Sequence, residues 1–494
     1  MHIDQQLLTK KMTENIKTLG ELKAAGYSPK SIKDELRTNL IAKLHAKEPA
    51  FQGIIGYDST VLPNLERAIL SKHNINLLGL RGQAKTRLAR GLVNLLDEWM
   101  PIIEGSEIND DPFQPISKYG MDKVEANGDD TPISWIHRND RFFEKLATPD
   151  VTVADLIGDV DPIKAANLKL SYADERVIHY GMIPRANRCI FVINELPDLQ
   201  ARIQVALFNI LQEGDVQIRG FQFRLNLDLQ FIFTANPEDY TNRGSIVTPL
   251  KDRIGSQILT HYPVNRDIAR AITTQESNIN DELIQKIHVP ELASILLEQI
   301  SFEARTSEFI DVKSGISARM AITAYENLMS TAELRLIKSG EKSTSIRMSD
   351  LLGIIPSITG KVELVYEGEQ EGSEEVALLL MGSAIKTLFD EYFMEMKKLA
   401  KAGEYDDFDK LTEWFINNPG FELINESKNE AFIQAINSIE PLSNIIEKFQ
   451  PNLPDADIVF VKEFVLWAMV EYKKLDKKKF EEGYEFEDTI MKGY

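Results

Sequence analysis

The chain has 494 residues, 43% of them hydrophobic, with a formal net charge of −20 and a pI near 5.0. This length predicts three or four domains, and the apolar content is sufficient for buried cores. The acidic balance argues against sequence-independent nucleic-acid binding, because such a surface repels a phosphate backbone. The single cysteine, Cys189, excludes a disulfide within the chain. No apolar run is long enough for a signal peptide or a membrane span, so we expect a cytoplasmic protein.

Residues 1–48 are predicted to form an N-terminal helical segment. Charged residues alternate there with Leu and Ile at helical spacing, and the pattern is broken at Gly26–Pro29, which indicates two or three helices. The lysines of this segment could form a basic patch. A solvated helical face is the favoured interpretation.

The segment 75–86 combines a buried strand, a glycine-bearing loop and the start of a helix. Residues 79–86 follow the phosphate-loop pattern G-x-x-x-x-G-K-[ST], except that Ala84 stands at the second glycine position. In such a loop the backbone N–H groups face the phosphates, the lysine reaches their oxygens and the hydroxyl residue ligates Mg²⁺. A positive φ at Ala84 would cost about 1 kcal/mol, whereas a right-handed backbone would cost nothing. The residues expected to bind the nucleotide here are Gly79, Arg81, Gly82, Gln83, Ala84, Lys85, Thr86 and Arg87. The alternative is an ordinary strand-loop-helix joint with a surface lysine.

A second buried strand, Cys189–Ile193, ends in Asn194 and Glu195. Parallel strands deliver their last residues to the carboxyl edge of a sheet, where one side chain orders the Mg²⁺ shell and the next polarises the attacking water. Asn194 stands where an aspartate is usual. It can accept a hydrogen bond from metal-bound water but brings no charge, whereas the carboxylate of Glu195 is present. The alternative interpretation is a core strand with a capping Asn–Glu pair.

A third buried strand, Leu229–Ala235, runs into Asn236. With these strands in this order the chain resembles the AAA+ ATPases, and within them the helix-2-insert group that contains the MoxR ATPases and the magnesium-chelatase I-type subunit. The resemblance implies that Asn236 is sensor 1, the polar residue that holds the hydrolytic water. It also implies that Ile55 and Gly56 lie where the family holds the adenine.

Two arginines extend the resemblance. Arg253, in Pro249–Gly255, lies in a segment that looks like the family's "LLDRFG" turn, whose arginine points into the neighbouring subunit's nucleotide. Arg319, in Gly315–Arg319, lies where the helical lid of the family carries sensor 2. Each arginine alone is more typical of a solvated surface charge, and it is the order of the five motifs that gives them these implied roles.

Residues 181–188 are similar to the "GLLARANRG" stretch of the chelatase branch. The resemblance implies a helix-2 insert at about 150–182 and a β-hairpin at about 215–225 that faces the central pore of a ring. A polar insertion at about 104–130 is predicted to be a surface loop.

The predicted fold is therefore α/β, an AAA+ P-loop core with a parallel sheet, followed by a helical lid and an all-α C-terminal region. The core is expected at 49–262 and the lid at 263–375, where an acidic, glycine-bearing stretch at 367–375 reads as a linker. A helical C-terminal domain is expected at 376–494.

The resemblance implies an ATP hydrolase that uses ATP and Mg²⁺. It also implies a homo-oligomer, a hexameric ring, that remodels or assembles a partner protein such as one with a von Willebrand factor A domain. The residues expected to act in catalysis are Glu195, Asn236, Arg253 and Arg319. Those expected to hold the metal are Thr86 and Asn194. Two alternatives stay open. One is the ATPase subunit of a metal chelatase, and the other is a nucleotide-gated scaffold in which Ala84 and Asn194 weaken hydrolysis.

Overall fold

In the computed structural model the described residues are 15–171, 174–216, 218, 225–237, 245–393, 407–425, 427–480 and 483–488. They fall into two compact units, the first ending at His261 and the second beginning at Tyr262.

The first unit is built around a five-stranded sheet in which every neighbouring pair is parallel. In spatial order the strands are β11 (Ser256–Leu259), β1 (Ile75–Leu78), β10 (Leu229–Ala235), β7 (Cys189–Asn194) and β4 (Phe142–Leu146). Because all five strands point the same way, their carboxyl ends meet at one edge. The ends of β1, β7 and β10 are the places where the sequence predicts the phosphate loop and the two polar pairs.

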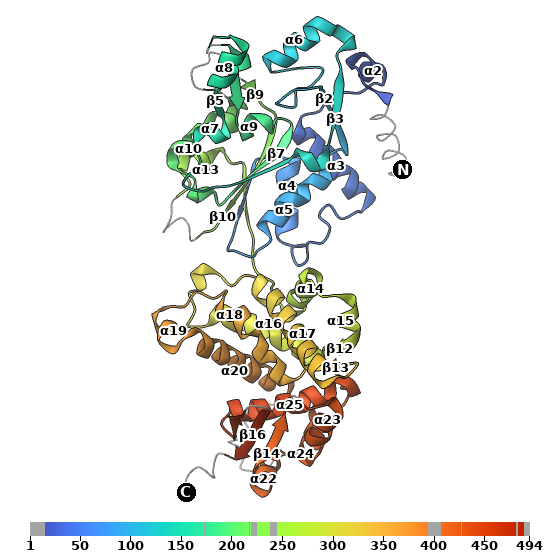
Figure 1. Ribbon diagram of the computed structural model, residues 1–494, viewed down its shortest axis with the longest axis vertical. Coiled ribbons are helices and arrows are strands. Elements are labelled where there is room, and N and C mark those ends of the chain that lie inside the picture. The colour runs from blue at the N-terminus through green and yellow to red at the C-terminus, as the bar shows by residue number, and fades with distance from the viewer. Residues whose placement is uncertain are drawn as a thin grey trace. The chain divides into compact units, whose positions relative to one another are not determined.

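Helices cover both faces of this sheet (Figure 1). Along β7, Ile190 and Val192 enter one hydrophobic cluster while Phe191 and Ile193 enter the other, so alternate residues serve opposite faces. The helices of one face are α3 (Ile32–Ala46), α4 (Val61–Leu70) and α5 (Lys85–Gly91), and those of the other are α10 (Ala201–Ala206), α11 (Phe208–Glu213) and α13 (Thr248–Arg253). The predicted α/β core with a parallel sheet is confirmed.

A buried ion pair joins α3 to the beginning of the sheet. Arg141 is 1% exposed and donates to both carboxylate oxygens of Glu35 at 2.7 Å. It also donates to the carbonyl of Arg188 at 2.9 Å. Burial alone would lower the pKa of Arg141, but the charge and hydrogen bonds of Glu35 outweigh it and raise that pKa above its ordinary value.

Three predicted segments of the first unit lie between the core strands. The segment at about 150–182, predicted to be a helix-2 insert, contains α7 (Val153–Leu156), β5 (Gly158–Val160), α8 (Pro162–Leu168) and β6 (Ile178–Tyr180), with β5 and β6 antiparallel, and α9 (Met182–Arg185) begins at its end. The hairpin at about 215–225 is described mainly at its base, where β8 (Asp215–Val216) pairs with β9 (Leu225–Asn226), and residues 217 and 219–224 lie outside the described residues.

The insertion at 104–130 differs from the predicted surface loop because it contains α6 (Lys118–Asn127). The Ser117 side chain accepts from the N–H of Gly120, and the buried Asp110 accepts from the Ser117 N–H and hydroxyl. These bonds satisfy the first turn of the helix. On either side of it, β2 (Trp99–Ile103) and β3 (Ile133–His137) form an antiparallel pair. Before the core, α2 (Leu19–Ala24) and α3 supply two of the predicted N-terminal helices.

The second unit is mainly helical, and one hydrophobic cluster runs through it from Ile287 to Phe486. Its elements up to residue 392 are α14 (Arg266–Glu276), α15 (Asp281–Lys286), β12 (Ile287–His288), α16 (Glu291–Thr306), α17 (Arg319–Ser339), β13 (Thr344–Ser345), α18 (Ile355–Thr359), α19 (Tyr366–Glu371) and α20 (Ser373–Tyr392). The stretch 367–375, predicted to be a linker, is helical instead, and Gly372 with φ +93° separates α19 from α20.

The end of the second unit adds a small sheet that the sequence did not predict. Beyond residue 407 the elements are α22 (Asp407–Asn417), β14 (Phe421–Ile424), α23 (Asn429–Asn437), α24 (Glu440–Phe449), α25 (Asp455–Glu471), β15 (Leu475–Lys479) and β16 (Gly483–Asp488). The three strands are antiparallel in the order β14-β16-β15. The otherwise helical character of this region is as predicted. No helix among the described residues is both long and apolar enough to cross a lipid bilayer.

Two buried carboxyl groups make the second unit sensitive to pH. Glu298 and Glu463 are 2% and 1% exposed, and burial raises the pKa of each to about 7. The hydroxyl of Thr273 donates to Glu298 at 2.6 Å, and the N–H of Met348 donates to Glu463 at 2.8 Å, and both bonds lower the pKa only in part. Between the ordinary value of 4.5 and about 7, the folded chain therefore holds protons that the unfolded chain has lost.

It follows that the stability of the second unit falls as the pH rises from about 5 to about 7, and then levels off. Glu298→Gln stays neutral throughout, so its advantage in unfolding free energy over the wild type should grow by about 2 kcal/mol across that range. Urea unfolding, monitored by hydrogen exchange of α14 and α16, measures this difference in unfolding free energy. Glu375→Gln, on the exposed surface of α20, is the control. A pH-independent difference would contradict the raised pKa.

Candidate functional site

The predicted phosphate loop connects β1 to α5. Gly82 has φ +76° and Ala84 has φ +55°, while Gln83 between them is not among the residues with positive φ. Successive N–H groups in such an alternation point into a common concavity that suits an anion. The loop has this form even though Ala84 replaces glycine, and the left-handed conformation costs that residue about 1–2 kcal/mol.

Side chains from segments far away in the sequence hold the loop in place. Gln83 is buried, and its side chain accepts from the hydroxyl of Thr260 at 2.7 Å. A Cβ at Gly79 would collide with both of these side chains, so the start of the loop requires glycine. The hydroxyl of Tyr57 reaches the carbonyl of Gln83 at 3.0 Å and that of His261 at 2.8 Å. These contacts hold the loop at a fixed position relative to the edge of the sheet.

Lys85 is the first residue of α5 and is 8% exposed. Its ammonium group donates to the carbonyls of Gly79 and Leu80, the latter at 3.1 Å, so its charge is held at the loop. Leu88 and Ala89 anchor the helix in the hydrophobic cluster beneath the sheet. The adjacent hydroxyl of Thr86 is half-buried, whereas Arg81 and Arg87 are exposed.

A chain of hydrogen bonds crosses the sheet edge at the end of β7. The N–H of Glu195 donates to the hydroxyl of Thr234 at 3.1 Å, and that hydroxyl donates to the side-chain carbonyl of Asn194 at 3.2 Å. The amide nitrogen of Asn194 donates to Glu144 at 2.5 Å, and Glu144 also accepts from Arg90 at 2.7 Å.

Glu195 itself has φ +54°, a left-handed conformation that is uncommon for this residue type. Strained backbone of this kind persists only where the surrounding contacts hold it, and it concentrates at functional sites. The bond from its N–H to Thr234 is one such contact. The carboxylate of Glu195 is therefore presented at the sheet edge by a fixed backbone.

Asn236 directly follows β10, the strand between β1 and β7. Ala235 pairs with Leu78, and the carbonyl of Ala235 accepts from the N–H of Gly79 at 3.1 Å. The end of β10 is therefore joined to the first residue of the loop. The structure brings the loop, Asn194, Glu195 and Asn236 to the same edge.

Ile55 and Gly56, predicted to lie against the adenine, immediately precede the Tyr57 that supports the loop. Arg253 lies at the end of α13, where it donates to the side chain of Gln212 at 3.1 Å and stacks over the ring of Phe208 at 5.1 Å. Its part in a neighbouring subunit stays a prediction.

Arg319 begins α17 in the second unit and is exposed. Its role as sensor 2 stays a prediction, because it belongs to a different unit from the loop.

Sequence reasoning missed Glu144, Thr234, Thr260 and Tyr57. Thr234 lies within a mainly apolar strand, and its hydroxyl could have been noticed as the polar group directly before Ala235–Asn236. Glu144 follows two phenylalanines in β4, a segment without a motif. Its neighbour Asn194 is brought to it only by the register of β4 against β7, in which Leu146 lies opposite Asn194.

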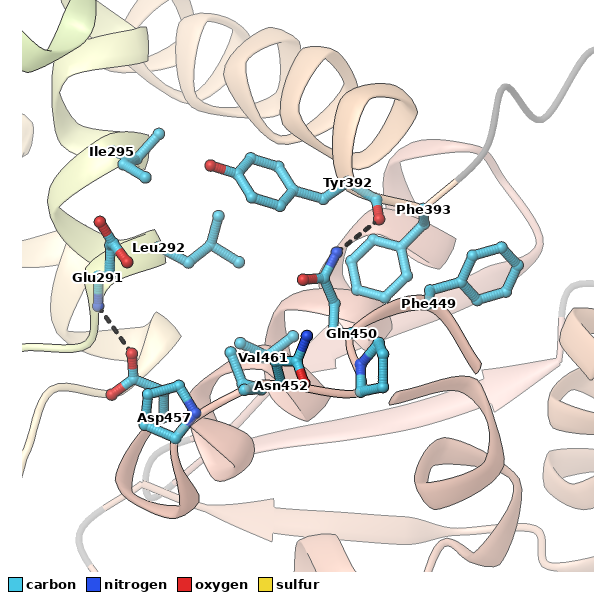
Figure 2. A pocket seen from close by; sticks show the side chains of 13 residues that line it. Glu291, Leu292, Ile295, Tyr392, Phe393, Phe449, Gln450, Asn452, Asp457 and Val461 are labelled. Atoms are coloured by element: carbon cyan, nitrogen blue, oxygen red, sulfur yellow. Dashed lines mark hydrogen bonds between the residues drawn. The ribbon is translucent and has the colours of Figure 1, made fainter. Parts of the chain in front are cut away.

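A hollow of about 360 Å³ in the second unit is a different kind of site. Its wall carries the rings of Tyr392, Phe393 and Phe449, and Glu291 and Asp457 lie at one end, where the N–H of Glu291 donates to Asp457 at 3.0 Å (Figure 2). No lysine or arginine is among the described residues that line it. Acidic and apolar walls do not suit a phosphate, so the loop of the first unit remains the candidate phosphate site.

No protein-family model matches the chain. Solved structures to which it is similar include NtrX of Brucella abortus (12% identity, 81% of this chain and 72% of that chain, TM-score 0.37). Others are a complex of subunits BchI and BchD of magnesium chelatase (18%, 65% and 98%, 0.33) and RuvB of Thermotoga maritima (11%, 93% and 92%, 0.32). The structures in this set are AAA+ ATPases. Similarity at these TM-scores does not bear on the function of the site, which is inferred from the geometry of the site itself.

The left-handed conformation at Ala84 can be tested by one substitution at two positions of the same segment. Ala84→Gly should stabilise the chain by about 0.5–1 kcal/mol, because the relief of strain exceeds the extra entropy that glycine gives the unfolded chain. Ala89→Gly, inside α5, should destabilise it by about 1 kcal/mol or more. Urea unfolding measures both changes, and destabilisation by Ala84→Gly would contradict the conformation described for the loop.

Proposed function

We propose that this chain is an AAA+ ATPase that binds Mg-ATP at the loop of the first unit and uses its hydrolysis to remodel or assemble a partner protein. The observation that carries the proposal is the meeting of three features at one sheet edge. A concave loop with the buried Lys85 follows β1, the Asn194–Glu195 pair ends β7, and Asn236 ends β10 between them. Phosphoryl transfer needs such groups together, because its catalysis consists of positioning and of charge stabilisation.

The residues have distinct parts in this proposal. The loop N–H groups and Lys85 would hold the β- and γ-phosphates, and Thr86 would hold the metal, which neutralises charge on the phosphates when bound. Glu195 would take a proton from the attacking water as its oxygen bonds to the γ-phosphorus and the bond to the bridging oxygen breaks. Asn236 would orient that water.

The assembly is also a proposal. Arg253 lies on the surface of the first unit, so it would act on a neighbour's nucleotide in a homo-oligomeric ring, a hexamer in this proposal, while Arg319 would couple the γ-phosphate to movement of the helical second unit. The resemblance of the sequence motifs to the AAA+ ATPases supports a ring. A von Willebrand factor A domain protein is the client that the sequence resemblance suggests.

A nucleotide-gated scaffold is the second candidate, and two observations favour it. Ala84 strains the loop, and Asn194 has its amide nitrogen and its carbonyl oxygen engaged by Glu144 and Thr234. In that case ATP would set the assembly state without rapid turnover.

Binding is tested at the loop lysine. Lys85→Met keeps the side-chain length but removes the charge, so it should raise the ATP dissociation constant at least about tenfold, the scale of lost charge-assisted hydrogen bonds. Calorimetry measures this, with Lys118→Met on the exposed surface of α6 as the control. Urea unfolding of both variants reports whether the loss of the Gly79 and Leu80 contacts alters folding. Wild-type affinity in a folded Lys85→Met chain would overturn the phosphate site.

Turnover separates the enzyme from the scaffold. Glu195→Gln should bind ATP normally but hydrolyse it at least about a hundredfold more slowly, because a positioned base is lost. Arg253→Ala should also bind ATP and turn over slowly, and mixing it with Glu195→Gln chains should restore activity where an intact Arg253 faces an intact Glu195.

The matched control for Arg253 is Gln212→Ala, which removes one side-chain hydrogen-bond partner of Arg253 but keeps the arginine. It should remain active. Equal turnover in the wild type and Glu195→Gln would favour the scaffold, and a Gln212→Ala chain as slow as Arg253→Ala would contradict the trans role.

A further inference from the structure

Asn194 and Glu144 form a matched pair at the sheet edge. A carboxylate can only accept hydrogen bonds unless it is protonated, so the amide of Asn194 has one favourable orientation, with its nitrogen toward Glu144 and its oxygen toward Thr234. An aspartate at position 194 would place two carboxylates about as close as this bond of 2.5 Å. The neutral residue at 194 and the charged one at 144 therefore suit each other.

Glu144 is also contacted from α5, the helix that carries Thr86. Arg90, which contacts Glu144, is four residues after Thr86, and residues four apart lie on one face of a helix, about 6 Å apart along its axis. Thr86 therefore shares the face of α5 from which Arg90 reaches Glu144. The contact with Arg90 is itself worth little, because the Arg90 side chain is 65% exposed.

We propose that Glu144 supplies the carboxylate for the Mg²⁺ of the bound nucleotide, in place of the aspartate that position 194 lacks. Asn194 is then a positioning residue that aims Glu144. This inference rests on the proposed function. The donors at hand are one carboxylate, one hydroxyl at Thr86 and the phosphates of the nucleotide, and Mg²⁺ bound to nucleotides usually has one or two protein carboxylates with substrate phosphates and water.

The negative charge has been moved by one strand, from β7 to β4, and the hydrogen bond from Asn194 keeps it in place. This explains how the site can hold Mg²⁺ although the usual aspartate is absent. The proposal also leads to a specific expectation for Asn194 and Glu144. Exchanging the two side-chain groups should preserve both the hydrogen bond and the net charge.

The test compares three variants of the full chain. Glu144→Gln removes the charge, Arg90→Gln removes the ion pair but keeps the carboxylate, and the double variant Glu144→Gln/Asn194→Asp exchanges amide and carboxylate. The measurement is the Mg²⁺ concentration that half-saturates binding of a non-hydrolysable ATP analogue. Electron paramagnetic resonance of Mn²⁺ with the same analogue provides a second readout that does not depend on turnover.

We expect Glu144→Gln to raise the Mg²⁺ requirement at least about fivefold, since a unit charge near the metal is lost. Arg90→Gln should leave the requirement unchanged or lower it. The exchanged pair should recover most of the loss and should restore the Mn²⁺ spectrum of the wild type.

Other outcomes overturn the assignment in distinguishable ways. If the wild type binds the analogue with Mg²⁺ and Glu144→Gln behaves identically, the Glu144 assignment falls and the proposed function stands. If Arg90→Gln raises the requirement as much as Glu144→Gln, or if the exchanged pair shows no recovery, Glu144 has only a structural part. If the wild type binds no analogue at any Mg²⁺ concentration, both proposals fall.

Discussion

The buried ion pair between Glu35 and Arg141 is the interaction on which the site geometry depends. Arg141 immediately precedes β4, and its guanidinium group also holds the carbonyl of Arg188, which immediately precedes β7. The pair therefore clamps the beginnings of both strands to α3. Glu35 accepts in addition from the N–H of Asp97 at 2.6 Å, so its carboxylate is well satisfied. Removing one member of such a pair leaves an uncompensated buried charge, at a cost of about 3–5 kcal/mol.

Because the ion pair fixes where β4 and β7 begin, it also fixes which side chains meet near the carboxyl ends of these strands. With Phe142 opposite Ile190, Glu144 comes within 2.5 Å of Asn194, and a slip of one residue would turn it to the other face of the sheet. The loop after β1 has a similar dependence, since Gln83 rests on Thr260 at the end of β11. The site is thus assembled by register across four neighbouring strand pairs, and the strained φ of Ala84 is tolerated because the loop is held at both ends.

The parts of the site that the sequence could predict are those in which one strand and its next residues carry the signal. The strands before Gly79, Asn194 and Asn236 are mainly apolar, which is typical of parallel strands covered on both faces. Glu144 could not be found in this way, because its strand is short, half-buried and mixed in polarity, and its importance comes from a neighbour fifty residues away. The terminal β14-β16-β15 sheet was missed for a related reason, since β15 carries three consecutive lysines that resemble a solvated helix end.

The contact of Tyr57 links the loop to the end of the first unit. Its hydroxyl carries one proton, yet it faces two carbonyls, that of Gln83 in the loop and that of His261, the last residue of the unit. Tyr57 is 6% exposed, so a carbonyl that loses this proton gains little from water in exchange. A movement of the loop that lengthens the hydrogen bond to one carbonyl therefore favours the hydrogen bond to the other carbonyl. The conformation of the loop and the point at which the chain leaves the first unit are therefore not independent of each other.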